Sequence, residues 1–199
     1  MKNIKLFYIL ALGLLLTLGA CEKDSKSSGG GDDPSTPEGK IEMSVAALGT
    51  DGEKLINKLE KNSWEYSSSG YGYDEMYIYT KKNEMCEILL DYDEVYAVAW
   101  VDYYDSFSDA IDALCDYHDA AVNKAKDEYY GQYDGYSTKE FSEPSEFIKY
   151  MKSVKEKDMK NASAGEYFLN LKKEYGISIG IGYDEYMNCW IVEASASNY

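Results

Sequence analysis

Ser178 lies at the centre of the segment GISIG (176–180), which has the G-x-S-x-G pattern of a nucleophile elbow. In that motif the serine stands at a sharp turn between a strand and a helix, and its histidine base follows later in the chain. Here the serine falls within an alternation of isoleucines, and the single histidine, His118, comes earlier. The pattern therefore predicts a strand residue, and we expect no catalytic residue at this position.

His118 falls on the apolar stripe of a predicted helix, where a buried structural histidine is the expected outcome. One histidine does not make a zinc site of the usual kind, and the chain has no C-x-x-C or H-E-x-x-H pattern. Acidic turns such as DYDEVY (91–96) lack the glycine and the spacing of an EF-hand loop. We expect no metal and no cofactor, and a calcium ion bound by acidic turns stays open as an alternative.

The charged residues exclude several classes of partner. The net charge is −16, and all 20 basic residues are lysines. A field of this sign repels nucleic acid, and the absence of arginine removes the bidentate clamps that suit phosphate groups. Nucleic-acid and nucleotide binding are therefore not expected. The 36 acids could include the carboxylate pair of a glycosidase, but the sequence does not single out one pair.

Tyrosine is present in excess, with 21 residues. Rings on strands either pair across neighbouring strands or form an amphipathic contact surface. The pairing accounts for most of them, and an exposed remainder is our candidate binding surface. The candidate ligand-binding residues are Tyr71, Tyr73, Tyr77, Tyr79 and Trp100.

The N-terminus has the features of a lipoprotein signal peptide (1–20). Two lysines precede the apolar run 6–20, which is shorter than the roughly 20 residues of a spanning helix. The run ends in LGAC (18–21), which resembles the bacterial lipobox, and the charged residues after it resemble the surface lipoproteins of the Bacteroidota. The resemblance implies lipid attachment at Cys21 and outer-membrane anchoring, facing the cell exterior or, alternatively, the periplasm.

Residues 21–40 are rich in Ser, Gly, Pro and Asp, so we expect a flexible tether there. Residues 41–199 are long enough for a single domain with its own core. The free cysteines would be Cys86, Cys115 and Cys189, and one disulfide among them stays open.

Periodicity in the domain predicts an α+β fold. Helices are expected from a capping box at 50–53 to about 61, and at 107–129, 144–154 and 163–176, with a loop at 129–137. The region 64–103 alternates with period two and predicts a meander of three or four antiparallel strands, and two more strands close the chain. We therefore expect an antiparallel sheet of five or six strands with helices gathered on one face.

The last two strands allow a register prediction. A loop at 184–186 would place Gly180 opposite Trp190, so that the indole covers the glycine. The pattern G-x-G-Y-D-E occurs at 70–75 and at 180–185, which indicates either a degenerate helix-plus-hairpin repeat or a chance recurrence. Such a repeat is similar, at the level of fold, to the β-lactamase inhibitor proteins.

These observations favour a surface-tethered, non-catalytic recognition module for polysaccharide or protein. An inhibitor of an exported enzyme or an envelope assembly factor is the alternative, and a hydrolase comes third. The expected partners are the membrane, through the lipid at Cys21, and a glycan or protein ligand.

Overall fold

The protein is described from a computed structural model, which covers residues 34–70 and 75–199. Five helices occur in this part of the chain: α1 (Pro37–Ala47), α2 (Gly52–Lys61), α3 (Phe107–Lys124), α4 (Pro144–Met151) and α5 (Glu156–Met159). The first four strands are β1 (Glu65–Gly70), β2 (Glu75–Lys81), β3 (Glu84–Asp91) and β4 (Glu94–Tyr104). The others are β5 (Glu128–Asp134), β6 (Thr138–Phe141), β7 (Ser163–Asn170), β8 (Tyr175–Asp184) and β9 (Cys189–Asn198).

The strands form one antiparallel sheet in the order β1-β2-β3-β4-β9-β8-β7-β5-β6. The α+β class and the antiparallel pairing are confirmed, whereas the expected strand number of five or six is wrong, because the described residues form nine. The predicted meander at 64–103 corresponds to β1–β4. Since β4 joins this meander to β9, it lies inside the sheet, as its apolar residues on both faces indicated.

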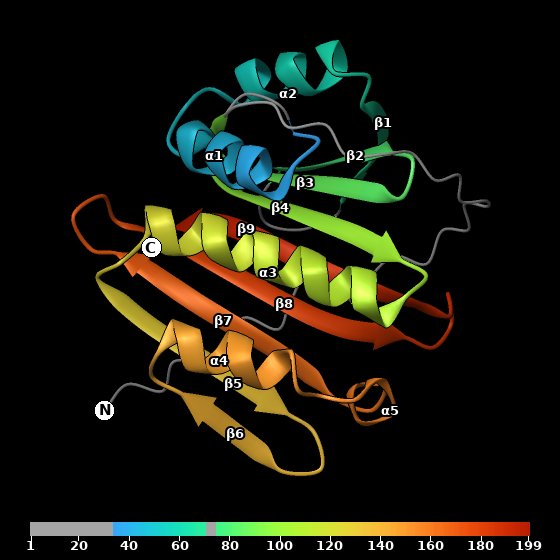
Figure 1. Ribbon diagram of the computed structural model, residues 1–199. Coiled ribbons are helices and arrows are strands. Elements are labelled where there is room, and N and C mark those ends of the chain that lie inside the picture. The colour runs from blue at the N-terminus through green and yellow to red at the C-terminus, as the bar shows by residue number, and fades with distance from the viewer. Residues whose placement is uncertain (1–33, 71–74) are drawn as a thin grey trace.

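The helices pack against the same face of the sheet (Figure 1). Along the strands, residues that belong to a hydrophobic core alternate with residues that do not. In the larger core the strand residues pack with α3, α4 and α5, and in the smaller core they pack with α1 and α2. In β8, for example, Ile177, Ile179 and Ile181 are buried, as predicted, and Ser178 is exposed on the other face. We call these two sides the helix face and the open face.

Two segments expected to be helix or loop are strands. The segment SAGE (163–166) has the spacing of a helix capping box, but Ala164, Glu166 and Phe168 alternate inward as β7. The predicted helix 163–176 is therefore wrong, because the period of two outweighs the local cap signal. The predicted loop 129–137 is largely β5, and α3 ends at Lys124 rather than at Tyr129.

Helix α1 was not expected, because 21–40 was interpreted as a tether. Its start has ordinary helix signals: Thr36 accepts a hydrogen bond from the Gly39 N–H at 3.1 Å, and Pro37 occupies the first turn. Lys40 is 1% exposed, and Ile41 belongs to the larger core. The folded domain therefore begins before residue 41.

The β8–β9 hairpin has a different register from the predicted one. Gly180 lies opposite Glu193, and Trp190 lies opposite Tyr183. The loop spans 185–188 because Asp184 Oδ1 accepts hydrogen bonds from the N–H groups of Tyr186 and Met187, which keeps Asp184 in the strand. The expected covering of Gly180 by the indole is therefore wrong, since Trp190 lies on the helix face.

The two G-x-G-Y-D-E segments are not both described. The second runs from β8 into the hairpin loop, and residues 71–74 of the first lie outside the described residues. The repeat stays a prediction.

Candidate functional site

The aromatic residues proposed for ligand binding lie mostly in the core. Trp100 is fully buried and donates to Ser44 Oγ at 2.7 Å, and Tyr79 is 3% exposed. Tyr77 is half-buried and packs against the smaller core. Tyr71 and Tyr73 lie outside the described residues. The described members of the set therefore stabilise the helix face and offer no row of exposed rings.

Ser178 is an exposed strand residue on the open face. Its Oγ lies 2.9 Å from the Oγ of Ser195 on β9. His118 belongs to α3 and lies on the opposite side of the sheet, so it does not reach this serine. The arrangement agrees with the predicted strand residue and supplies no base for a serine nucleophile.

A buried cluster surrounds His118 on the helix face. His118 Nδ1 lies 2.8 Å from both carboxylate oxygens of Glu166 on β7, and the Tyr129 hydroxyl donates to Glu166 Oε2 at 3.1 Å. Burial raises the pKa of Glu166, and the hydrogen bonds from His118 and Tyr129 oppose this shift. A general base also needs its second ring nitrogen within reach of a substrate. His118 is only 6% exposed, so we interpret this cluster as structural.

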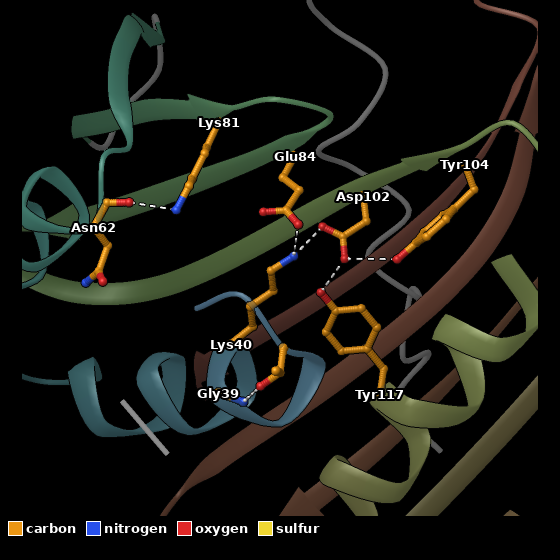
Figure 2. Close-up of polar contacts among 9 residues, drawn as sticks. Gly39, Lys40, Asn62, Lys81, Glu84, Asp102, Tyr104 and Tyr117 are labelled. Atoms are coloured by element: carbon orange, nitrogen blue, oxygen red, sulfur yellow. Dashed lines mark hydrogen bonds and ion pairs between the residues drawn. The ribbon is translucent and has the colours of Figure 1, made fainter. Parts of the chain in front are cut away.

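A second buried cluster is built on Lys40 (Figure 2). Lys40 Nζ lies 2.5 Å from Asp102 Oδ1 and 3.5 Å from Glu84 Oε1. The other oxygen of Asp102 accepts from Tyr117 at 2.8 Å and from Tyr104 at 3.5 Å. Burial raises the pKa of Glu84, and the nearby ammonium opposes that shift. Since Asp102 is bound by a cation and two hydroxyls, this cluster fastens α1 and α3 to β4.

The open face carries a different set of side chains. The strand register places on it Ile78, Met85, Glu87, Leu89, Ala97, Ala99, Val101, Tyr167, Ser178, Ile191, Glu193 and Ser195. None of these residues belongs to either hydrophobic core formed with the described helices. Over β2, β3 and β4 the face is mainly apolar, whereas over β8 it is nearly bare of side chains.

Glu87 stands in the apolar part of the open face. It lies opposite Ile78 on β2 and Ala99 on β4. It is 6% exposed, yet no described residue makes a hydrogen bond or an ion pair with it. Desolvation, and to a smaller extent the negative charge of Glu193, raise its pKa from 4.5 to about 7. Burial also raises the pKa of Glu193.

Glycines make a shallow strip beside this acidic pair. A methyl group added at Gly182 would meet nothing within 4 Å, and one at Gly180 would meet only the Ala164 carbonyl oxygen at 3.6 Å. At the other end of the strip the Tyr167 ring lies over Gly176, whose added methyl would come within 2.2 Å of the Tyr167 hydroxyl oxygen. The backbone of β8 is thus accessible between a tyrosine and a carboxylate.

Two depressions lie on the helix side. One, of about 510 Å³, lies between the start of α3 and the α4–α5 region and is lined by Phe107, Asp112 and Lys152 among others. The other, of about 520 Å³, lies near the ends of α1 and α3 and is lined by Lys124 and Tyr175 among others. Both are shallow, and neither contains the His118 cluster or the Lys40 cluster.

The described residues contain no group of three or more His, Cys, Asp or Glu side chains arranged to hold a metal ion. Cys86, Cys115 and Cys189 form no disulfide with one another. Within the described ranges no helix has the length and apolar character of a membrane span.

Comparison with protein-family models, with curated proteins and with solved structures gave no match.

Sequence reasoning missed the pair Glu87 and Glu193. A signal for the first was present, because Glu87 interrupts the apolar run of β3, MCEILL (85–90), in a strand inside the sheet. The second has no comparable signal, because Glu193 alternates with buried residues as a solvated strand residue would. Only the register brings both acids to one face.

Proposed function

We propose that this chain is a lipid-anchored recognition module that binds a protein or a polysaccharide through the open face of its sheet. The observation that carries the proposal is the accessible backbone of β8 on that face, where Ser178 is exposed and a methyl group added at Gly182 would meet nothing within 4 Å. Trp100 and Val98 pack into the smaller core, whereas Ala97, Ala99 and Val101 face away from the described helices.

Ala97, Ala99 and Val101 are themselves 8%, 2% and 3% exposed, so the accessible part of the open face lies over β8, at Ser178. The glycine strip of β8 adds accessible backbone, and Tyr167 adds an amphipathic ring. These features suit the docking of a flat or extended partner.

The anchoring part of the proposal depends on the N-terminal sequence. A lipid at Cys21 would hold the domain at a membrane, and a lipobox cysteine with more than one acyl chain would hold it durably. The open face would then be presented to partners at the outer membrane, on the cell exterior.

Binding is tested with the folded domain and a blocking substitution on the open face. Ser178→Arg adds a long side chain at an exposed open-face position, and Ser153→Arg adds the same side chain at an exposed position after α4. Each protein is immobilised and screened against a glycan array and against solubilised envelope proteins. Circular dichroism and thermal midpoints establish that both variants fold.

The proposal predicts a ligand that the parent and the Ser153→Arg protein retain and that the Ser178→Arg protein loses. Equal retention by both variants would place recognition elsewhere and overturn the role of the open face. Anchoring is tested separately in cells, where Cys21→Ser should move the protein from the membrane fraction to the soluble fraction. An unchanged membrane fraction would refute lipid attachment at Cys21.

A further inference from the structure

Accessible tyrosines gather on the open face at the end of the sheet where β8 begins. Tyr167 on β7 is half-buried, Tyr96 on β4 is 41% exposed, and Tyr199, which follows β9, is 59% exposed. The strand register places Tyr167, Ser178 and Ser195 in one row across β7, β8 and β9. The alternation of β9 then carries Tyr199 to the same face as Ser195.

Contacts at the start of β8 bring two of these rings together. The Tyr167 ring lies over Gly176, where an added methyl group would come within 2.2 Å of its hydroxyl oxygen and 2.7 Å of a ring carbon. From the other side, the Tyr199 hydroxyl donates to the Asn170 carbonyl oxygen at 3.5 Å. Asn170 pairs with Tyr175, the residue before Gly176. Both rings therefore cross the first residues of β8, one from β7 and the other from the end of β9.

Tyr96 extends this group to β4. It is the extra residue of a bulge beside Val95, which belongs to the smaller core, so its side chain turns away from the helix face. Burial raises the pKa of Tyr167, and the charges of Tyr199 and Tyr96 add to this shift, as expected of neighbouring hydroxyl groups. We call Tyr96, Tyr167 and Tyr199 the tyrosine group.

The accessible surface beside the tyrosine group is polar and nearly flat. Ser178 is exposed, Ser195 and Ser197 are partly exposed, and the glycines of β8 leave backbone accessible. Because Ala97 and Ala99 are already buried, the apolar side chains of a protein partner would find little apolar surface here. The groups that remain suit a sugar chain, whose rings have apolar faces that pack on tyrosine and hydroxyl edges that form hydrogen bonds.

Charge restricts the sugar chain to a neutral one. Desolvation and, after it, the negative charges of Glu174, Glu128 and Asp127 raise the pKa of Tyr199, so these carboxylates lie around the tyrosine group. Together with the net charge of −16 they repel an anionic polysaccharide. Carboxylates accept hydrogen bonds, so they complement the hydroxyl groups of a neutral sugar.

We propose that the tyrosine group is a binding platform for a neutral polysaccharide chain, which packs its sugar rings against the tyrosines of the open face. This inference rests on the proposed function, and it narrows the ligand from protein or polysaccharide to neutral polysaccharide. Neighbouring strands lie about 4.8 Å apart, so the three steps from β4 to β7 separate the backbones of Tyr96 and Tyr167 by about 14 Å. Tyr199 lies between them, and the platform therefore suits a chain of several sugar units rather than a single sugar.

The experiment uses defined oligosaccharides as probes. The neutral probes are cellohexaose, xylohexaose, mannohexaose, laminarihexaose and maltohexaose, and the matched anionic probe is hexagalacturonate. Each is titrated into the isotope-labelled mature protein, and amide chemical shifts report affinity and location. The disaccharide of any neutral hexaose that binds tests the dependence on chain length.

At least one neutral hexaose is expected to bind and to perturb amides of β7, β8 and β9, and its disaccharide should bind more weakly. Tyr199→Ala should weaken binding about fivefold to tenfold, because it removes one exposed ring of the platform. Tyr96→Ala provides a second variant with the same expected direction. Tyr136→Ala makes the same chemical change at an exposed position after β5 and should leave affinity unchanged.

Four results would overturn the inference. No neutral hexaose could bind, hexagalacturonate could bind as tightly, the perturbed amides could lie on the helix side, or both Tyr199→Ala and Tyr96→Ala could retain full affinity. None of them refutes the proposed function, which is judged by the Ser178→Arg screen. A protein ligand lost in that screen, together with no hexaose binding, would uphold the open face and reject a polysaccharide ligand.

Discussion

Glu166 and Glu87 lie on opposite faces of the same sheet and are both almost fully buried. Glu166 contacts the His118 imidazole and the Tyr129 hydroxyl, both on the helix face. No described residue makes such a contact with Glu87, which lies between apolar neighbours that desolvate it. The same side-chain type is thus held by specific partners on one face and is surrounded mainly by apolar groups on the other.

The same contrast extends to the rest of each face. On the helix face the polar groups join helices to strands. Lys40 of α1, for example, forms ion pairs with Glu84 on β3 and with Asp102 on β4. On the open face the described contact between Ser178 and Ser195 joins two neighbouring strands. The polar contacts of the helix face therefore hold the helices to the sheet, whereas this contact of the open face holds strands to each other.

Removing Asp102 should have the largest effect on stability. Asp102→Ala leaves Lys40 facing only Glu84 at 3.5 Å and leaves the Tyr117 hydroxyl without its acceptor. Loss of one partner of a buried ion pair costs about 3–5 kcal/mol of unfolding free energy. Urea denaturation at pH 7 measures the loss. Glu42→Ala is the control, because its pair with Lys124 is partly exposed and should cost about 1 kcal/mol or less. Similar losses in both variants would contradict the assignment of the Lys40 cluster.

Replacing Glu166 or Glu87 by glutamine should change the free energy of unfolding in opposite directions. Glu166→Gln removes the charge that His118 and Tyr129 contact, so the free energy of unfolding should fall by about 1–3 kcal/mol. The measurement is denaturant unfolding at pH 8. A neutral or stabilising result would mean that the His118 cluster does not hold α3 to β7.

Glu87→Gln should raise the free energy of unfolding at pH 8. Burial raises the folded-state pKa of Glu87 from 4.5 to about 7, so the contribution of Glu87 to stability is most favourable below pH 4.5 and is lost as the pH rises through 7. Glutamine carries no charge to desolvate. The variant should therefore exceed the wild type by about 1–3 kcal/mol at pH 8 and match it near pH 4. Urea unfolding at both pH values tests this, and a destabilised variant at pH 8 would show that Glu87 has a partner within the fold.

The smallest effect concerns the glycine strip of the open face. Gly182→Ala adds a methyl group where nothing lies within 4 Å, and it should raise unfolding free energy by about 0.5–1 kcal/mol. Gly176→Ala forces the Tyr167 ring to move, and it should lower the free energy of unfolding by about 1–3 kcal/mol. Thermal unfolding of the two variants provides the comparison. The same sign for both would argue against the arrangement of Tyr167 over β8.

The sequence predicted the helices and strands in which apolar residues recur with one clear period. The amphipathic stripe of α3 and the alternation of β4 are examples, since each continues over three or more repeats. The strand β7 was missed because its first four residues have the spacing of a helix capping box. The alternation of buried and less buried residues along the whole strand is the longer signal, and it corresponds to the observed structure. Helix α1 was missed because its first residues share the Ser, Gly, Pro and Asp composition of segment 21–40, which was interpreted as a tether.

The candidate site was harder to predict from the sequence than the fold. The strand order brings β9 between β4 and β8, which places Glu193 near Glu87 although 106 positions separate them in the chain. Nothing local in either strand specifies that neighbour relation. The tyrosine excess directed attention to Tyr77 and Tyr79, but burial on the helix face accounts for both.

The most direct test of the account is a pH titration of the glutamate side-chain carboxyl carbons by NMR in the mature protein without ligand. The account predicts that Glu87 titrates near pH 7, because it is desolvated and lies near Glu193. A Glu87 carboxyl that titrates near 4.5 would show that it is solvated. In that case the contrast between the two faces would be contradicted.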